Sequence, residues 1–313
     1  MVLNMNDYVA LLLGVAAAGV GGELFVRGSV GIAQWVRISP GIVGATVAAF
    51  ATSSPELSVS INAASAGTPQ ISLGDILGSN VVNVALILGL ALSFSGIQCP
   101  HGSIKRDFPI ALLVPIVSGI LMLDGVISRI DGVLLLCMFL FWLVSTAIEA
   151  RKQRSEAEEI LGEHKHWRAI VACVIGLAFL FAAGYLIVRG ATGIATAHGI
   201  DAFIIGATIV AIGTSVPELA TTLISKWRGH DEVGLGTVLG SNIFNGLLIV
   251  AVAAIICPIT IKFHEVAVAL IFGIVAVALT YPAKNGLIER RRGFILLVLY
   301  AAYLVAIIQT HAG

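Results

Sequence analysis

Hydrophobic residues in this chain gather in long runs that short polar stretches separate. Each run is roughly 20 residues long, which is the length an α-helix needs to cross about 30 Å of hydrocarbon. Because helices satisfy their own backbone hydrogen bonds in lipid, the pattern predicts an all-α integral membrane protein. The ten expected transmembrane helices cover approximately 7–33, 40–67, 71–95, 107–123, 127–148, 167–194, 202–227, 233–257, 262–281 and 290–310.

Composition supports this class. The chain is 58% hydrophobic and 12% charged, whereas soluble domains are about 25% charged. The formal net charge is zero, so nucleic-acid binding is not expected. The four cysteines form no Cys-x-x-Cys pair, so neither a disulfide framework nor a zinc site is expected. We expect no cofactor.

Basic residues are distributed unevenly among the polar connections. Fourteen of the eighteen Lys and Arg residues lie in odd-numbered connections, and Arg129 and Lys262 lie in even-numbered ones. The positive-inside rule therefore places the odd connections in the cytoplasm and both termini on the other side. Short loops favour a prokaryotic inner membrane.

The chain contains an internal repeat. A displacement of 162 residues aligns the motif Gly44–Asn83 with the motif Gly206–Asn245 without a gap, and 17 of 40 positions are identical. ATSSPEL meets GTSVPEL, and GDILGSNVVN meets GTVLGSNIFN. Shared apolar composition alone would not produce this agreement.

Each repeat unit holds five expected spans. Because five is odd, the second copy enters the membrane from the opposite side. We expect a first five-helix repeat over 1–148, a cytoplasmic hinge loop over 149–168, and a second, inverted repeat over 169–313. Inverted repeats are typical of secondary transporters, whose substrate sites lie near the midplane where discontinuous helices meet.

Two glutamates occupy matched positions well inside spans. Glu56 and Glu218 each follow a proline, Pro55 or Pro217. An acidic residue at the bilayer centre costs roughly 2.5–3.5 kcal/mol even on the lenient insertion scale, so a matched pair predicts function. A proline inside a helix removes one donor, which is expected to free carbonyl oxygens in the turn before each glutamate.

Hydroxyl and amide groups accompany both glutamates. They belong to Thr52, Ser53, Ser79 and Asn83 in the first copy, and to Thr214, Ser215, Ser241 and Asn245 in the second. Asn80 and Asn242 add amides on a neighbouring face. An all-oxygen set suits hard cations. Calcium takes six to eight oxygens, and sodium would use subsets of them.

Two glycine pairs recur with the motifs. Gly74-x-x-x-Gly78 and Gly236-x-x-x-Gly240 predict close helix packing around the site.

Other charged residues receive simpler interpretations. Glu23 and Arg27 are four residues apart, so we expect an ion pair within one helix and no transport role. Asp75, which Thr237 matches in the second copy, is expected at an entrance or an interface.

At these motifs the chain resembles the cation/calcium exchanger superfamily, and within it the sodium/calcium exchanger branch. The Gly-Asn-x-x-Glu pattern of the proton/calcium branch is absent here. The resemblance implies a two-bundle fold in which helices 2, 3, 7 and 8 enclose four central cation sites. Helices 1 and 6 are then expected to slide across this core to alternate access.

The resemblance also implies roles for individual residues. Glu56 and Glu218 would be shared ligands of calcium and sodium. Thr52 and Thr214 would add carbonyl oxygens to these shared ligands. The flanking sodium sites would be completed by the side chains of Ser53, Ser79, Ser215 and Ser241 with the carbonyls of Ala49 and Ala211, while Asn83 and Asn245 would face the middle site. Many sodium/calcium exchangers carry aspartate at the position of Asn245, so the central charge here is −2 instead of −3.

We favour antiport of calcium for sodium across the membrane. Exchange of calcium or another divalent cation for protons stays open because of Asn245, and a passive cation channel could use similar oxygen rings. An enzyme is not expected, because a nucleophilic Ser53 or Ser79 would need a basic partner and the spans offer none at that depth. Expected partners are calcium, sodium and the lipid bilayer, while the oligomeric state stays open.

Overall fold

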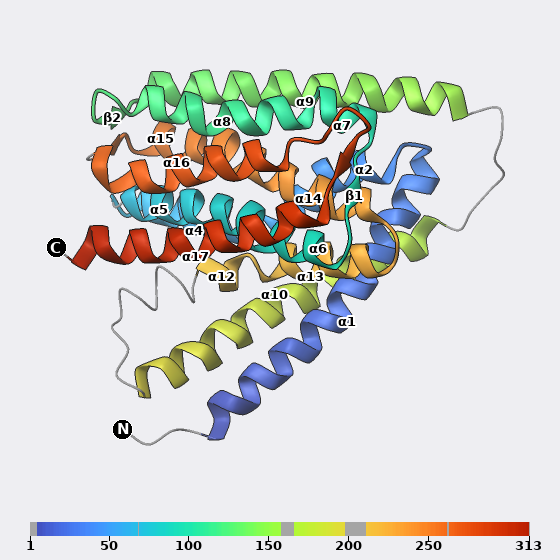
Figure 1. Ribbon diagram of the computed structural model, residues 1–313, viewed down its shortest axis with the longest axis horizontal. Helices are drawn as coiled ribbons and strands as arrows, with labels where there is room; N and C mark the ends of the chain where they lie inside the picture. Colours follow the sequence, from blue (N-terminus) through green and yellow to red (C-terminus); the bar gives the residue numbers. More distant parts are fainter. Residues whose placement is uncertain (1–4, 68, 158–165, 198–210, 262, 313) are drawn as a thin grey trace.

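Long helices dominate the computed structural model, which describes residues 5–67, 69–157, 166–197, 211–261 and 263–312 (Figure 1). Most helices run side by side along the long axis. Helices α1 (Met5–Val36) and α10 (His166–Ala197) pack against each other and lean away from the rest (Figure 1). The chain is an all-α bundle with one helix pair standing apart.

The other elements alternate long helices with short connections. The first half continues with α2 (Pro40–Val43), η1 (Gly44–Ala48), α3 (Ala49–Thr52), α4 (Ser54–Ser65), α5 (Pro69–Val81), η2 (Val82–Leu88), α6 (Gly89–Phe94), β1 (Ile97–Gln98), α7 (His101–Lys105), α8 (Asp107–Leu121), β2 (Val126–Ile127) and α9 (Arg129–Ala157). The second half continues with α12 (Ala211–Thr214), α13 (Val216–Trp227), α14 (Asp231–Ile243), η4 (Phe244–Ile249), α15 (Val250–Ile256), β3 (Ile259–Thr260), α16 (Phe263–Thr280), β4 (Leu287–Ile288) and α17 (Arg290–Ala312).

Two helices break at the proline motifs. Ser53 separates α3 from α4, and the chain bends by 45° there. Its φ of −86° and ψ of 8° recur at Ser215, where they are −86° and 9°. These angles lie in the sparsely populated bridge region, where many functional residues sit. Pro55 and Pro217 then occupy the first turn of the new helix, where a missing N–H costs nothing.

Wider π-helical turns occur at η1, η2 and η4 among the described residues. Asn83 lies in η2 and Asn245 lies in η4. Because π turns are rare and occur frequently at functional sites, their recurrence at two candidate ligands marks the same region as the helix breaks.

Two short β-ladders connect the halves. Strand β1 pairs antiparallel with β4, and β2 pairs antiparallel with β3. Strands β1 and β3 begin 162 residues apart, which is the repeat offset. Each ladder therefore joins one half to the other. The hydrophobic pattern did not predict these strands.

Five helices within the described ranges are long and apolar enough to cross a membrane, or six if the bent pair at Ser53 is one span. The five are Asp7–Val36, Ser72–Phe94, Arg129–Lys152, Trp167–Ile187 and Asp231–Ile256. A shorter apolar helix covers Val266–Thr280. Parts of the expected spans 202–227 and 262–281 lie outside the described residues, so the count of ten stays a prediction.

Helix α14 approaches the broken first-half helix closely at two glycines. A methyl group on Gly236 would lie 2.5 Å from the carbonyl oxygen of Gly41 and 2.9 Å from the nitrogen of Ala45. On Gly240 it would lie against the Ala45 carbonyl and 2.7 Å from the Cβ of Ala49. The predicted close packing is confirmed for this pair.

The matching pair in the first half is less constrained by the residues that the structure describes. A methyl group on Gly74 would meet nothing there within 4 Å, and on Gly78 only the Tyr303 hydroxyl at 3.8 Å. The segment 206–210, which the repeat relates to 44–48, lies outside the described residues. Close packing at Gly74 and Gly78 therefore stays a prediction.

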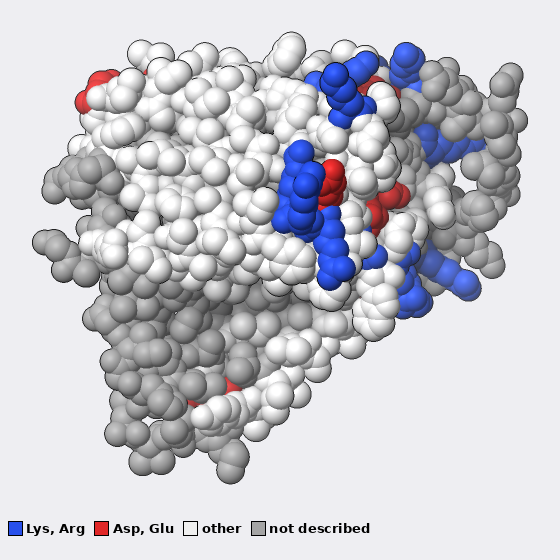
Figure 2. Space-filling model, in the orientation of Figure 1, with Lys and Arg blue, Asp and Glu red and all other residues white. Residues whose placement is uncertain are grey.

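Basic residues gather at one end of the molecule. On the face in Figure 2, the described Lys and Arg residues lie over the end that holds α7 and β1, and none of them is seen over the other end. The last turns of α17 lie at the opposite end of the long axis (Figure 1). The charge asymmetry seen along the sequence is thus an asymmetry in space.

Candidate ion-binding site

Two buried glutamates lie in the first turns of the helices that begin at the breaks. Glu56 belongs to α4 and Glu218 to α13, and each is 1% exposed. They are close enough for their charges to interact. The free N–H groups at a helix N-terminus carry partial positive charge, which offsets part of the cost of a buried carboxylate. The fold therefore brings two buried carboxyl groups to two helix starts.

Hydroxyl groups from both halves surround Glu218. The Ser53 Oγ donates to Glu218 Oε1 at 3.3 Å, and the Ser241 Oγ donates to the same oxygen at 3.1 Å. The Thr52 Oγ1 lies 3.4 Å from the Ser241 Oγ. All four side chains are buried. Glu218 of the second half is thus hydrogen-bonded to Ser53 at the helix break of the first half.

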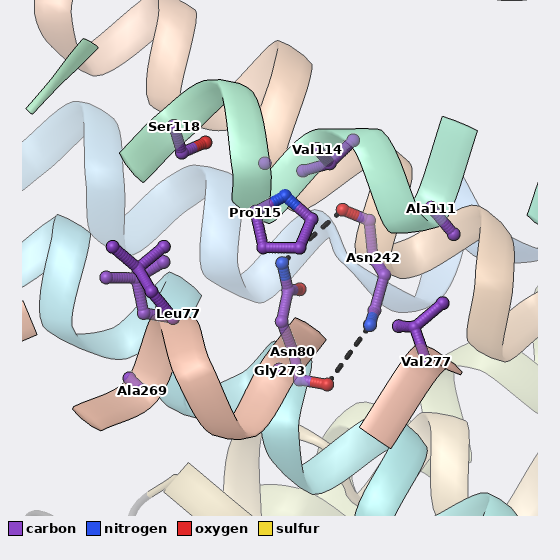
Figure 3. A pocket seen from close by; sticks show the side chains of 12 residues that line it. Leu77, Asn80, Ala111, Val114, Pro115, Ser118, Asn242, Ala269, Gly273 and Val277 are labelled. Atoms are coloured by element: carbon purple, nitrogen blue, oxygen red, sulfur yellow. Dashed lines mark hydrogen bonds between the residues drawn. The ribbon is translucent and has the colours of Figure 1, made fainter. Parts of the chain in front are cut away.

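Four asparagines form a second network. Asn80 and Asn242 each donate from Nδ2 to the backbone carbonyl of the other, at 3.4 and 3.1 Å (Figure 3). Asn83 Nδ2 donates to Asn242 Oδ1 at 3.1 Å, and Asn245 Nδ2 donates to Asn80 Oδ1 at 3.1 Å. The network joins α5 and η2 to α14 and η4 with the same pattern in both directions.

Six buried oxygens of the predicted ligands have no hydrogen-bond partner within the described residues. They are Glu56 Oε2, Ser79 Oγ, Asn83 Oδ1, Ser215 Oγ, Glu218 Oε2 and Asn245 Oδ1. Buried polar atoms are almost always paired, so each exception needs an explanation. Cations bound among these oxygens would supply the missing interactions, and oxygens of carboxylates, amides and hydroxyls are ligands that hard cations accept.

The Ala49 carbonyl differs from the expectation. Its oxygen accepts a hydrogen bond from the Ser53 N–H at 3.0 Å and another from the Thr52 hydroxyl at 3.3 Å. Pro55 removes the donor from the carbonyl four residues earlier, which is that of Ala51. The prediction of a freed carbonyl is therefore wrong at Ala49. Its role as an ion ligand stays a prediction, and requires the Thr52 hydroxyl to turn away.

The second half places its predicted residues in equivalent elements. Thr214 ends α12, Ser215 forms the break, and Ala211 begins α12. Ser215 is fully buried, and Thr214 is half-buried. The start of the second motif, 206–210, lies outside the described residues.

Asp75 and Thr237 occupy matched positions with different chemistry. Asp75 lies one turn before Ser79 on α5, and its Oδ2 is buried without a partner in the described residues. The Thr237 hydroxyl donates to the Val233 carbonyl of its own helix at 2.8 Å. The two halves are therefore not equivalent in charge near the site.

An ionic cluster lies away from the site on α1. Glu23 pairs with Arg27 on the same helix, as predicted, which confirms that expectation. Glu23 also accepts a hydrogen bond from Arg228 Nε at 2.8 Å. This second bond ties α1 to the turn after α13, and a spacing of 205 residues gave no sign of it.

Comparison with known proteins decides the family. The family model described as "Sodium/calcium exchanger protein" matches residues 7–147 and 168–309. The chain belongs to the sodium/calcium exchanger family. Members of this family are helical membrane transporters, so the resemblance of the two motifs is confirmed.

Two relatives of this exchanger-family chain come from a bacterium and an archaeon. Inner membrane protein YrbG of Escherichia coli (strain K12) is 34% identical over 230 residues, which cover 71% of either chain. Uncharacterized membrane protein MJ0091 of Methanocaldococcus jannaschii is 33% identical over 308 residues, covering 96% of this chain and 97% of its own.

A solved structure shares the fold of this family member. The sodium-calcium exchanger NCX_Mj, soaked with 100 mM Na+ and 10 mM Sr2+, matches with a TM-score of 0.84 at 32% identity. The match covers 96% of this chain and 98% of that chain. The all-α membrane fold is therefore established over nearly the whole length.

From the sequence, the amides of Asn80 and Asn242 are expected beside the predicted ligands, but without an assigned role. Both stand in the repeated Gly-Ser-Asn sequence, at identical positions of the two copies. That identity was a usable signal, but a contact between two amides on different helices depends on the packing of α5 against α14.

Proposed function

We propose that this protein exchanges calcium for sodium across a membrane by alternating access. The observation that carries the proposal is the set of six unpartnered buried oxygens, two of which belong to the carboxyl groups at the helix breaks. A permanently empty site of this kind would be costly, because buried polar groups without partners destabilise a fold. A transported cation would account for the unpartnered oxygens and agrees with membership of the sodium/calcium exchanger family.

The charge of the two glutamates determines how many cations the site can balance. Glu56 and Glu218 contribute −2 when ionised, which one calcium ion or two sodium ions would balance. The other proposed ligands are the side chains of Ser53, Ser79, Ser215, Ser241, Asn83 and Asn245, with the carbonyls of Thr52, Thr214, Ala49 and Ala211. Because both ions need the same carboxylates, each would displace the other, and this competition couples their movements.

The membrane arrangement follows from the charge distribution. Ten spans would cross the membrane, with the basic end of the molecule in the cytoplasm. The position of the last turns of α17, opposite the basic end, supports an extracytoplasmic C-terminus (Figures 1 and 2). An even number of spans puts the N-terminus on the same side. Short loops and prokaryotic relatives support an inner membrane.

Two inverted halves would move relative to each other around a fixed site. The halves are 1–148 and 169–313, with the connection 149–168 as the hinge, of which 158–165 lie outside the described residues. Two observations support a two-fold relation between the halves. The same φ and ψ angles recur at the two helix breaks, and each β-ladder pairs a strand of one half with a strand of the other. Helices α1 and α10, which stand apart from the bundle, are the pair that would slide.

Exchange of calcium for protons is a second candidate function. Asn245 favours it, because an amide supplies no charge for an additional sodium ion. Protons would then occupy Glu56 and Glu218 in place of sodium.

Calcium uptake into sealed proteoliposomes distinguishes these functions. Vesicles loaded with sodium, with pH and voltage clamped by ionophores, should accumulate ⁴⁵Ca²⁺ above its external concentration. Equal sodium on both sides should stop the uptake. Uptake that follows an imposed proton gradient and ignores sodium would establish the second candidate. Movement only downhill under every gradient would indicate a channel.

A further inference from the structure

We propose that Asn80 and Asn242 are positioning residues that aim the side-chain oxygens of Asn245 and Asn83 at the transported ion. The proposal rests on the proposed function for the identity of that ion. It starts from the reciprocal hydrogen bonds between Asn80 and Asn242 in Figure 3.

Backbone carbonyls determine the orientation of the first two amides. Asn80 Nδ2 faces the carbonyl oxygen of Asn242, and Asn242 Nδ2 faces the carbonyl oxygen of Asn80. A backbone carbonyl can only accept a hydrogen bond, so each amide must turn its nitrogen toward it. The Oδ1 atoms of Asn80 and Asn242 therefore face the other way, as acceptors.

These acceptors determine the orientation of the next two amides. Asn245 Nδ2 donates to Asn80 Oδ1, and Asn83 Nδ2 donates to Asn242 Oδ1, both at 3.1 Å. An amide that presents its nitrogen on one side presents its oxygen on the other. Both of those oxygens are buried and lack a partner in the described part of the chain. Two hydrogen-bond relays, each running from a backbone carbonyl through one amide to the next, thus determine that the Oδ1 atoms of Asn83 and Asn245 face the ion.

The same relay disfavours a carboxylate at position 245. The N245D side chain, when ionised, has no hydrogen to donate to Asn80 Oδ1, so two buried acceptors would face each other. If the Asn80 amide turned over, it would face the carbonyl of Asn242 with its own oxygen. The network therefore selects a neutral amide at 245 and leaves the central charge at −2.

Calcium binding tests the positioning role. Purified full-length protein would be dialysed against ⁴⁵Ca²⁺, and the same variants would be assayed for uptake. We expect N80A to weaken calcium binding about 10- to 100-fold, as losses of groups that orient metal ligands do. The maximal rate at saturating calcium should change little, because the ligands themselves remain.

Leu77→Ala is the matched control. Leu77 lies on the same helix as Asn80 and lines the same pocket (Figure 3), and the substitution removes equally many heavy atoms. L77A should lower the melting temperature, because it leaves a cavity, while calcium affinity stays at the wild-type value. Wild-type affinity in N80A, or an equal loss in L77A, would overturn the proposal.

A second measurement needs no ion at all. N245D would be made in the wild-type and N80A backgrounds, and thermal unfolding would be followed with chelator and without sodium. We expect N245D to lower Tm in the wild-type background and to lower it much less with N80A, because the opposing acceptor is gone. Equal losses in both backgrounds would refute the relay. If the wild type fails to exchange calcium, the proposed function falls while this comparison still decides the inference.

Discussion

At the scale of single residues, the site is defined by oxygens that the protein itself leaves unsatisfied. Ser241 shows how the ligands are held, since its hydroxyl bonds Glu218 Oε1 and lies beside the Thr52 hydroxyl. Such bonds restrict the carboxylate before the ion arrives, which reduces the entropy lost on binding.

Ser241→Ala should therefore reduce the affinity for calcium more than it reduces the stability of the fold. We expect the calcium concentration for half-maximal uptake to rise about tenfold, in line with losses of groups that orient ligands. The measurement is uptake against calcium concentration, beside a melting curve. Thr146→Ala is the control, because this buried hydroxyl donates to the Trp142 carbonyl of its own helix. Equal calcium dependence in both variants would contradict the assignment.

The sequence predicted the features that follow from the two repeated motifs. It did not predict contacts that depend on side-chain conformation or on helix packing. The proline motifs located the breaks at Ser53 and Ser215, because proline geometry is local. The Ala49 carbonyl was predicted free and is occupied, since a threonine hydroxyl can fold back onto its own helix. The Glu23–Arg228 bond depends on how α1 packs, which no local pattern encodes.

At the scale of elements, helix α14 is the close-packed center of the bundle. Gly236 and Gly240 lie directly against the backbone of the first broken helix. This approach brings Ser241 and Asn242, which follow on α14, to the first half of the site. The ten hydrophobic runs predicted the helices but could not distinguish this buried helix from its neighbours, because spacing does not show which helix is central.

Gly240→Ala should destabilise the fold, because the added methyl group would overlap the Ala45 carbonyl. Overpacking of this kind costs about 1–3 kcal/mol, so detergent-purified protein should melt at a lower temperature. Gly19→Ala is the control, since a methyl group there meets no described atom within 4 Å and alanine favours a helix. A G240A variant that melts with the wild type would refute the close approach.

At the scale of the whole molecule, the described residues of the α1–α10 pair pack on the bundle through apolar clusters that are separate from the large core. Phe25 of α1 and Leu180 of α10 pack with Ala48 in a cluster separate from the large core. Glu23 and Arg228 add an ionic link between the pair and the bundle. Because these clusters are separate from the large core, the pair can slide without repacking that core, which the proposed alternation of access requires.

Cross-linking tests that motion. In a chain whose native cysteines are replaced, E23C and R228C joined by a short rigid bis-maleimide should abolish calcium uptake, because α1 could no longer move along α13. The same reagent across Q98C and L287C, which are register partners of the β1–β4 ladder, should leave uptake intact. Full uptake by the cross-linked E23C/R228C protein would contradict the sliding pair.

The most direct test of the central claim is calcium binding to the purified protein at increasing sodium concentration, with Glu56→Gln and Glu218→Gln variants beside the wild type. The claim is that both ions use one set of oxygens around these two carboxylates. We predict that sodium raises the apparent Kd of calcium until binding is lost, and that either variant stays folded but binds no calcium. Wild-type affinity in either glutamine variant, or calcium binding that sodium does not affect, would contradict the account.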